Sequence, residues 1–135
     1  MYKKIIVALA LDQGHGVTAL NVARKLLDQG GEIITLHVVE PLPSYIKHYM
    51  PENSEENLLE IIDDDMNDRI GEKQDATRVV LKGHPGQEVT NYAEEVGADC
   101  IVIGSHKPEL KDYFLGSTAS RIVRHASCAV HVIRK

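Results

Sequence analysis

The amino-acid sequence predicts an α/β fold: a single-domain, five-stranded parallel sheet with the strand order 3-2-1-4-5 and helices on both faces. Two observations support this. Short apolar runs are continuous rather than alternating, which is typical of strands covered on both faces. These runs alternate along the chain with segments in which apolar residues recur at helical spacing. At 135 residues the chain has the length of one domain, which we expect to span residues 1–135.

The first part of the chain predicts two strands and one helix. Residues 4–11 read KIIVALAL and are apolar almost throughout, as in a buried strand, and DQGHG at 12–16 is a turn. Apolar residues then recur at helical spacing over 17–27. Gly30-Gly31 is expected to end this helix as a C-terminal cap. The run IITLHVV at 33–39 predicts the second strand.

The middle of the chain predicts a loop and a long helix. The segment 41–51 has prolines at both ends, which marks it as a loop. Asn53, with Glu56 three residues later, has the spacing of a helix start. Apolar residues then recur about every four positions up to residue 66. We read the three aspartates at 63–65 as the solvated side of this helix, because no ligand pattern surrounds them.

Two further strands and a helix follow. Residues 77–82, TRVVLK, predict the third strand, and GHPGQE leads into a helix over 89–96 that Gly97 ends. The run DCIVIG at 99–104 predicts the fourth strand. Its continuous apolarity is again typical of a strand covered on both faces.

The last helix and strand complete the pattern. Ser117 is placed to cap a helix, and AVHVIR at 129–134 predicts the fifth strand. In the predicted order this strand lies at the sheet edge, where its backbone donors and acceptors lack partners. Antiparallel pairing of Ala129–Arg134 with a second copy would satisfy them, so we expect a homodimer.

Composition and charge exclude several function classes. The net charge of −5 opposes generic binding to nucleic acid, and no apolar run is long enough to span a membrane. The start, MYKKIIVALAL, has no convincing cleavage site and is read as a strand rather than a secretion signal. Cys100 and Cys128 lack CxxC spacing, so we expect buried, reduced thiols and a cytoplasmic protein.

The predicted strand order places a ligand site. Ligands of doubly wound sheets lie beyond the carboxyl ends of the strands, where the winding reverses. In the order 3-2-1-4-5 the loops at that point follow strands one and four, and they are DQGHG at 12–16 and GSHKPELKDYFLGST at 104–118. Both loops contain glycines, which let a ligand approach the backbone.

The second loop has the features of a phosphate site. The helix after Gly116 would begin with N–H groups that lack partners, at the positive end of its dipole. Ser117 and Thr118 add hydroxyl groups, and Lys107 with Lys111 adds positive charge. The spacing alone fits a strand-end turn and a plain helix cap as well.

Other chemistries find little support in the sequence. The phosphate-binding pattern GxxxxGK[ST] is absent, and 14–19 matches GxGxxG only if Ala19 replaces the last glycine. The histidines share no metal-ligand spacing, so no metal site is predicted. A triad of Ser117, His106 and Asp112 lacks the GxSxG turn, so no catalytic residue is predicted. His106 has two open roles, phosphate donor or loop structure.

Four segments carry a resemblance over essentially the whole chain: MYKKIIVALALD at the start, LHVVE at 36–40, GHPGQEV at 83–89, and the run from 101 to 135. On these residues the chain resembles the universal stress protein family. The resemblance implies a Rossmann-like five-stranded parallel sheet, usually in a dimer. One branch of the family binds ATP through the pattern G-x2-G-x9-G-[ST], and the other branch lacks it.

The resemblance also implies nucleotide contacts. Gly104 matches the first glycine of the pattern, Gly116 the last, and Ser117 the hydroxyl that follows. The resemblance implies that the other contact positions lie along the phosphates, the ribose and the adenosine of the nucleotide. The implied nucleotide-binding residues are Ala8, Leu9, Ala10, Asp12, Val38, Ile103, Gly104, His106, Lys107, Gly116, Ser117, Thr118 and Ala119.

The chain departs from the family pattern in three ways. Lys107 stands in place of the middle glycine, and the loop to Gly116 is one residue shorter. Ala10 stands where the family usually has an aspartate, and Asp12 is the candidate substitute. The run Ser105-His106-Lys107-Pro108 resembles the corresponding loop of nucleotide-binding members of the family. The first two departures are therefore compatible with ATP binding.

We therefore expect an ATP- or AMP-binding protein of the stress response, with Mg²⁺ left open. We expect phosphates to order the 105–115 loop against the helix at Gly116, and an unidentified protein partner to recognise the ordered surface. The alternatives are a dimeric interaction protein with a vestigial site and a slow ATPase. A membrane or nucleic acid is not expected as a partner.

Overall fold

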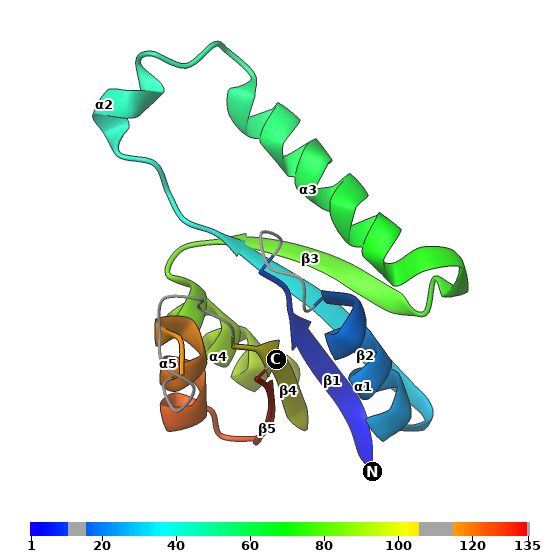
Figure 1. Ribbon diagram of the computed structural model, residues 1–135. Coiled ribbons are helices and arrows are strands. Elements are labelled where there is room, and N and C mark those ends of the chain that lie inside the picture. Colours follow the sequence, from blue (N-terminus) through cyan, green and yellow to red (C-terminus); the bar gives the residue numbers. More distant parts are fainter. Residues whose placement is uncertain (11–15, 106–114, 135) are drawn as a thin grey trace.

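The computed structural model describes residues 1–10, 16–105 and 115–134, which form one five-stranded parallel sheet (Figure 1). The strand order is β3-β2-β1-β4-β5, and every neighbouring pair is parallel. The predicted fold class and strand order are thus confirmed. The strands are β1 (Tyr2–Ala8), β2 (Leu27–Val39), β3 (Ala76–Lys82), β4 (Cys100–Gly104) and β5 (Ala129–Ile133).

Helices cover both faces of this sheet. Helices α1 and α3 pack on one face, and α4 and α5 pack on the other (Figure 1). The bounds are α1 (Gly16–Leu26), α2 (Ser44–Lys47), α3 (Ser54–Ile70), a 3₁₀ turn η1 (Gly71–Lys73), α4 (Pro85–Val96) and α5 (Ser117–His125). In the part of the chain that the structure describes, no helix is both long and apolar enough to cross a membrane.

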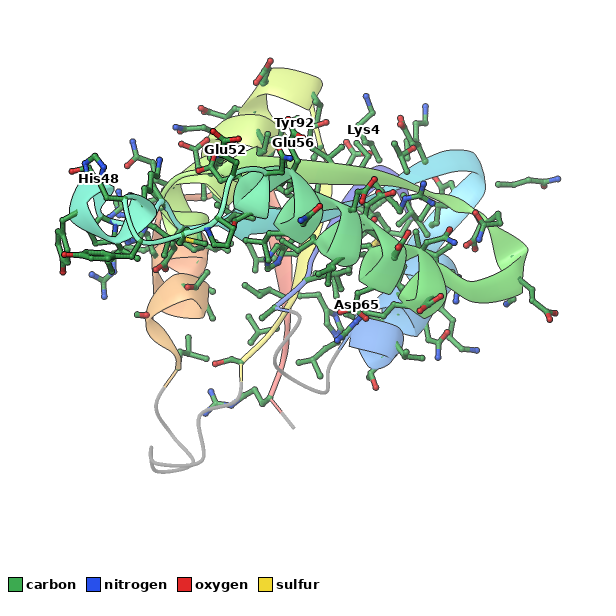
Figure 2. All side chains as sticks on the ribbon, turned by 90° about the horizontal axis from the view of Figure 1, so that it is seen from above. Lys4, His48, Glu52, Glu56, Asp65 and Tyr92 are labelled. Carbon is green, nitrogen blue, oxygen red and sulfur yellow. The ribbon has the colours of Figure 1, made fainter. Side chains whose placement is uncertain are left out.

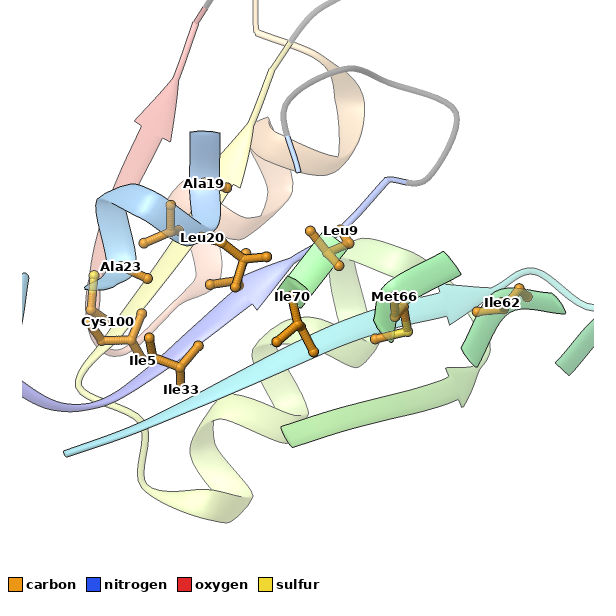
Figure 3. Packing of buried hydrophobic residues seen from close by; sticks show 12 residues of the cluster. Ile5, Leu9, Ala19, Leu20, Ala23, Ile33, Ile62, Met66, Ile70 and Cys100 are labelled. Carbon is orange, nitrogen blue, oxygen red and sulfur yellow. The ribbon is translucent and has the colours of Figure 1, made fainter. Parts of the chain in front are cut away.

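Strand β1 separates two apolar cores. Successive side chains of a strand point to opposite faces, so Ile5 and Val7 join the core under α1 and α3, whereas Ile6 joins the core under α4 and α5. All three are fully buried. Figure 3 shows the first core, where Leu20 of α1 and Met66 of α3 pack towards the sheet.

The prediction that Gly30-Gly31 ends the first helix is wrong. Helix α1 ends at Leu26, and both glycines lie within β2. The pairing of β1 with β2 jumps from Tyr2–Leu27 to Lys4–Glu32, so β2 carries extra residues at this point. Gly30 has a φ of +82°, which glycine adopts without strain. The glycines therefore accommodate a strand irregularity.

Helix α2 and the first half of α3 form an arm, residues 41–61, that projects beyond the sheet (Figure 1). The buried residues of α3 are Ile62, Met66 and Ile70, all in its second half. Figure 2 shows His48 at the far end of the arm. The expected loop at 41–51 therefore contains a short helix.

The start of α3 was predicted at the right place but for the wrong reason. Asn53 has a left-handed backbone (φ 68°), and no side chain caps the helix there, so Asn53 and Glu56 do not form the predicted cap. Of the three aspartates at 63–65, only Asp64 is exposed. Asp63 pairs with Arg78 and Asp65 with Arg69.

The two cysteines are free thiols on opposite faces of the sheet. Cys100 is buried in the core under α1 and α3, whereas Cys128 is half-buried against the core under α4 and α5. Burial raises the pKa of Cys100 to about 11, which keeps its thiol protonated at neutral pH. This agrees with the expected structural role.

Candidate functional site

A cavity of about 340 Å³ opens at the carboxyl edge of the sheet, where the strand order reverses between β1 and β4. The ends of β1, β2 and β4 form one side, and the beginnings of α4 and α5 form the other. The lining residues are Ala8, Leu9, Ala10, His37, Val38, Glu40, Pro85, Ile103, Gly104, Ser105, Gly116, Ser117, Thr118 and Ala119.

The floor of the cavity is apolar. Val38, Ile103 and Ala119 are each less than a tenth exposed and belong to the core under α4 and α5. Pro85, the first residue of α4, adds another apolar surface at the side. An apolar floor with a few polar groups around it is the usual composition of a small-molecule site, and it suits the faces of a planar ring.

The beginning of α5 supplies the polar wall. Its first backbone hydrogen bond runs from the Ser120 N–H to the Gly116 carbonyl oxygen, at 2.9 Å. The N–H groups of Ser117, Thr118 and Ala119 precede that bond, and no side chain caps this helix. These three N–H groups lie at the positive end of the helix dipole, which favours an anion.

Two details differ from the expected phosphate site. Ser117 is the first helical residue rather than the cap, and Gly116 is the N-cap residue, with an extended backbone at φ −62°. The Gly116 N–H donates to Ser105 Oγ at 2.9 Å, so it does not face a ligand. The amides that remain available to an anion are therefore the three after Gly116. Since any residue can adopt that φ, the backbone conformation does not require a glycine at this position.

His37 holds the end of β1 against β2. The Leu9 N–H donates to the Leu36 carbonyl oxygen at 2.8 Å. The Nδ1 atom of His37 lies 2.7 Å from the Leu9 carbonyl oxygen. A carbonyl oxygen only accepts, so Nδ1 carries the proton in this contact. These bonds fix the chain where it leaves β1 and becomes one wall of the cavity.

Ten of the thirteen predicted site residues are described, and all ten line this one cavity. Asp12, His106 and Lys107 lie outside the described residues, as does most of the 105–115 loop that was expected to become ordered. Four lining residues were not among the predicted contacts: His37, Glu40, Pro85 and Ser105. His37 and Glu40 belong to the LHVVE motif at 36–40, which is the sequence signal available for them.

The described lining is nearly without charge. Glu40 is its acidic residue, and it includes no lysine or arginine. Among residues 1–10, 16–105 and 115–134, no group of three or more His, Cys, Asp or Glu side chains is placed to hold a metal ion. Chemically, the described groups can bind an anion and an apolar ring.

The comparisons with known protein families and with related sequences agree on one family. The universal stress protein family model matches residues 1–134. Universal stress protein G of Escherichia coli O157:H7 is 32% identical over 146 residues, which cover 99% of this chain and 100% of that protein. The solved structure of the hypothetical protein MJ0577 is 29% identical, with a TM-score of 0.79, and the match covers 100% of this chain and 98% of that one.

Two more distant structures contain ligands. A universal stress protein from Archaeoglobus fulgidus in complex with dAMP has a TM-score of 0.67, and a universal stress protein in complex with cAMP has a TM-score of 0.66. Each is 19% identical to this chain, and each match covers 98% of this chain and 97% or more of that one. At this identity the likeness shows the shared fold.

Proposed function

The chain belongs to the universal stress protein family, and on that premise we propose that it binds an adenine nucleotide, ATP or AMP, in the cavity at the carboxyl edge of the sheet. The observation that supports this most is the pairing of an apolar floor with the amides of Ser117, Thr118 and Ala119 in one cavity. The dAMP and cAMP complexes of two distant relatives are consistent with it.

Each part of the nucleotide has a matching part of the site. The base would lie on the apolar floor formed by Val38 and Ile103. The phosphates would accept hydrogen bonds from the amides at the beginning of α5. The segment Ala8–Ala10, held by the bond between His37 and Leu9, would lie along the ribose.

We further propose that the protein is a cytoplasmic regulatory binder in the stress response and acts through a protein partner. In this role nucleotide occupancy changes the surface around the cavity mouth, and the partner distinguishes the two states. Strand β5 ends the described sheet on one side, and we propose that it pairs with a second copy to form a homodimer. Nucleic acid and membranes are not proposed as partners.

Calorimetry with ATP and AMP tests the binding proposal. A leucine in place of Gly116 fills the cavity next to the amides, so Gly116→Leu should abolish binding. The matched control is Asn91→Leu, which adds a leucine on the exposed side of α4 and should leave affinity unchanged. Wild-type protein that gives no binding heat with either nucleotide would support the vestigial-site alternative and contradict the proposal.

A second variant covers the case in which Gly116→Leu fails to fold. Ser117→Asp places a carboxylate in the first turn of α5, where it is compatible with the helix dipole. This carboxylate should repel phosphates and leave the apolar floor intact. ATP affinity should therefore fall much more than adenosine affinity. An equal loss for both ligands would show that the amides do not hold the phosphates.

A further inference from the structure

The proposed nucleotide site lacks a positive side chain in its described lining. Glu40 contributes negative charge, and no lysine or arginine is among the lining residues. Helix amides and hydroxyl groups can hold one phosphate, but each added phosphate brings more negative charge. Among the described residues, a cation that balances a second or third phosphate must therefore come from a side chain just outside the lining.

Arg121 lies beside the cavity, between its two helices. It is four residues after Ser117 on α5, so the two residues share a face of the helix. Side chains of a helix lean towards its N-terminus. For α5 that is the direction of the cavity, since Ser117, Thr118 and Ala119 line it.

The stem of Arg121 packs against the first turn of α4. A methyl group built on Gly86 would lie 2.7 Å from Cδ of Arg121, 3.0 Å from Cβ and 3.1 Å from Cγ. Gly86 is buried and directly follows Pro85, which lines the cavity. The absence of a side chain at Gly86 thus makes room for the arginine stem next to the wall of the site.

The guanidinium of Arg121 makes no hydrogen bond or ion pair with the described residues, and its side chain is exposed. Three other arginines already have acidic partners. Arg24 pairs with Asp75, Arg69 with Asp65, and Arg78 with Asp63. Arg121 therefore combines a stem held by packing with a charged group that is available to an anion.

We propose that Arg121 binds the phosphates beyond the first and so gives this site its preference for ATP over AMP. This inference rests on the proposed function and names its preferred ligand. The guanidinium offers several N–H donors in a planar fork that matches phosphate oxygens, and it stays charged at every physiological pH. The amides of α5 hold the phosphate nearest the ribose, and Arg121 contacts the outer ones across the mouth between α4 and α5.

The test is the dissociation constant of ATP and of AMP for two arginine variants. Arg121→Gln removes the charge from the cavity mouth, and Arg124→Gln removes the same charge three residues further along α5, at another exposed position. Hydrogen bonds to charged groups are among the stronger ones, so Arg121→Gln should weaken ATP binding by about tenfold or more. Its AMP affinity should change by less than about twofold, and Arg124→Gln should leave both constants near those of wild type.

A second variant moves the arginine without removing its charge. Gly86→Ala places a methyl group 2.7 Å from Cδ of Arg121, so the stem must shift. We expect the ratio of AMP to ATP dissociation constants to fall for Gly86→Ala. Combining Gly86→Ala with Arg121→Gln should add little further loss, because both changes act on one contact.

The outcomes separate this inference from the proposed function. If wild-type protein binds both nucleotides and Arg121→Gln leaves the ratio unchanged, this inference alone is overturned. An equal loss of ATP affinity in Arg121→Gln and Arg124→Gln would also overturn it, because general charge would then explain the effect. If wild-type protein binds neither nucleotide, the proposed function fails and this inference fails with it.

Discussion

Asp75 joins three parts of the molecule through a single arginine. Its two carboxylate oxygens accept hydrogen bonds from Nε and Nη2 of Arg24, at 2.7 and 2.8 Å. The same Nη2 also donates to the Ile70 carbonyl oxygen at 2.8 Å. Arg24 belongs to α1, Ile70 ends α3, and Asp75 precedes β3. The hydrogen bond from Arg24 lowers the pKa of the Asp75 carboxyl.

This contact predicts a pH-dependent contribution to stability. Because the folded state lowers the pKa of Asp75, the ionised carboxylate stabilises the fold at neutral pH. The contribution is lost as the pH falls below about 4, where the carboxyl becomes protonated. We expect Asp75→Asn to lower the free energy of unfolding by about 1 kcal/mol at pH 7. This value is near the upper end of the stabilisation that a partly exposed ion pair contributes.

Urea unfolding of wild type and Asp75→Asn at pH 7 and at pH 3 measures this effect. The difference between the two proteins should shrink at pH 3. Asp68→Asn provides the control, because Asp68 is exposed on α3 and makes no ion pair with the described residues. A difference that is as large at pH 3 as at pH 7 would show that the carboxylate charge is not the cause.

The residues of the cavity differ in how far the sequence could predict them. Gly104 and Gly116 could be found because glycine and helix-start patterns are visible in the sequence. Ser105 could not, because its role depends on accepting the Gly116 N–H across eleven residues, which requires the path of the loop. The bond between His37 and Leu9 likewise depends on the register of two neighbouring strands.

Helix α3 shows how unevenly a single element can contribute to stability. Its second half packs on the sheet through Met66, which is fully buried, and its first half belongs to the projecting arm, where Ile61 is 64% exposed. Deleting a buried Met side chain costs about 2–5 kcal/mol through lost burial and the cavity that remains. An exposed substitution usually changes stability by less than about 0.5 kcal/mol.

Met66→Ala should therefore destabilise the protein by about 2–5 kcal/mol, whereas Ile61→Ala should be nearly neutral. The two variants remove apolar groups from one helix, so intrinsic helix propensity affects both in a similar way. Thermal or urea unfolding measures the free-energy difference for each. Comparable losses for the two would mean that the first half of α3 packs against the body of the protein in solution.

The elements themselves were largely predictable, and the main exception is the glycine pair in β2. Four of the five predicted strands and the four long helices lie near their expected ranges, because burial on one or both faces leaves a clear pattern of apolar residues. Strand β2 is the exception, since it begins at Leu27 rather than at residue 33. Gly30-Gly31 was misread because a glycine pair permits both a helix end and a strand irregularity. The choice is made by pairing with β1, where the Lys3 carbonyl oxygen lies close to Gly31.

The topology of the whole molecule explains why a cavity could be expected at this edge of the sheet from the sequence alone. Alternating strands and helices give a parallel sheet, and the reversal between β1 and β4 opens a crevice at the carboxyl edge. The projecting arm could not be predicted in the same way. Apolar residues recur through the whole of α3, so their pattern does not indicate which part of the helix lies over the sheet and which part projects beyond it.

The proposed dimer predicts the mass of the particle in solution. Strand β5 forms one edge of the described sheet, and Ala129 and His131 on it are exposed. Light scattering should give twice the chain mass of 15.0 kDa. His131→Glu places like charges on both copies at the shared edge and should shift the population towards monomer. Glu95→Gln on α4 is a control remote from this edge. A wild-type protein that is monomeric at about 100 μM would contradict the proposed dimer, since the subunits of a stable dimer bind each other far more tightly than that.

A crystal structure of the protein grown in excess ATP would test the central claim most directly. The account predicts phosphate oxygens within hydrogen-bonding distance of the amides of Ser117, Thr118 and Ala119, with the adenine ring over Val38 and Ile103. Density for ATP at another place, or a cavity left empty at saturating ATP, would contradict it.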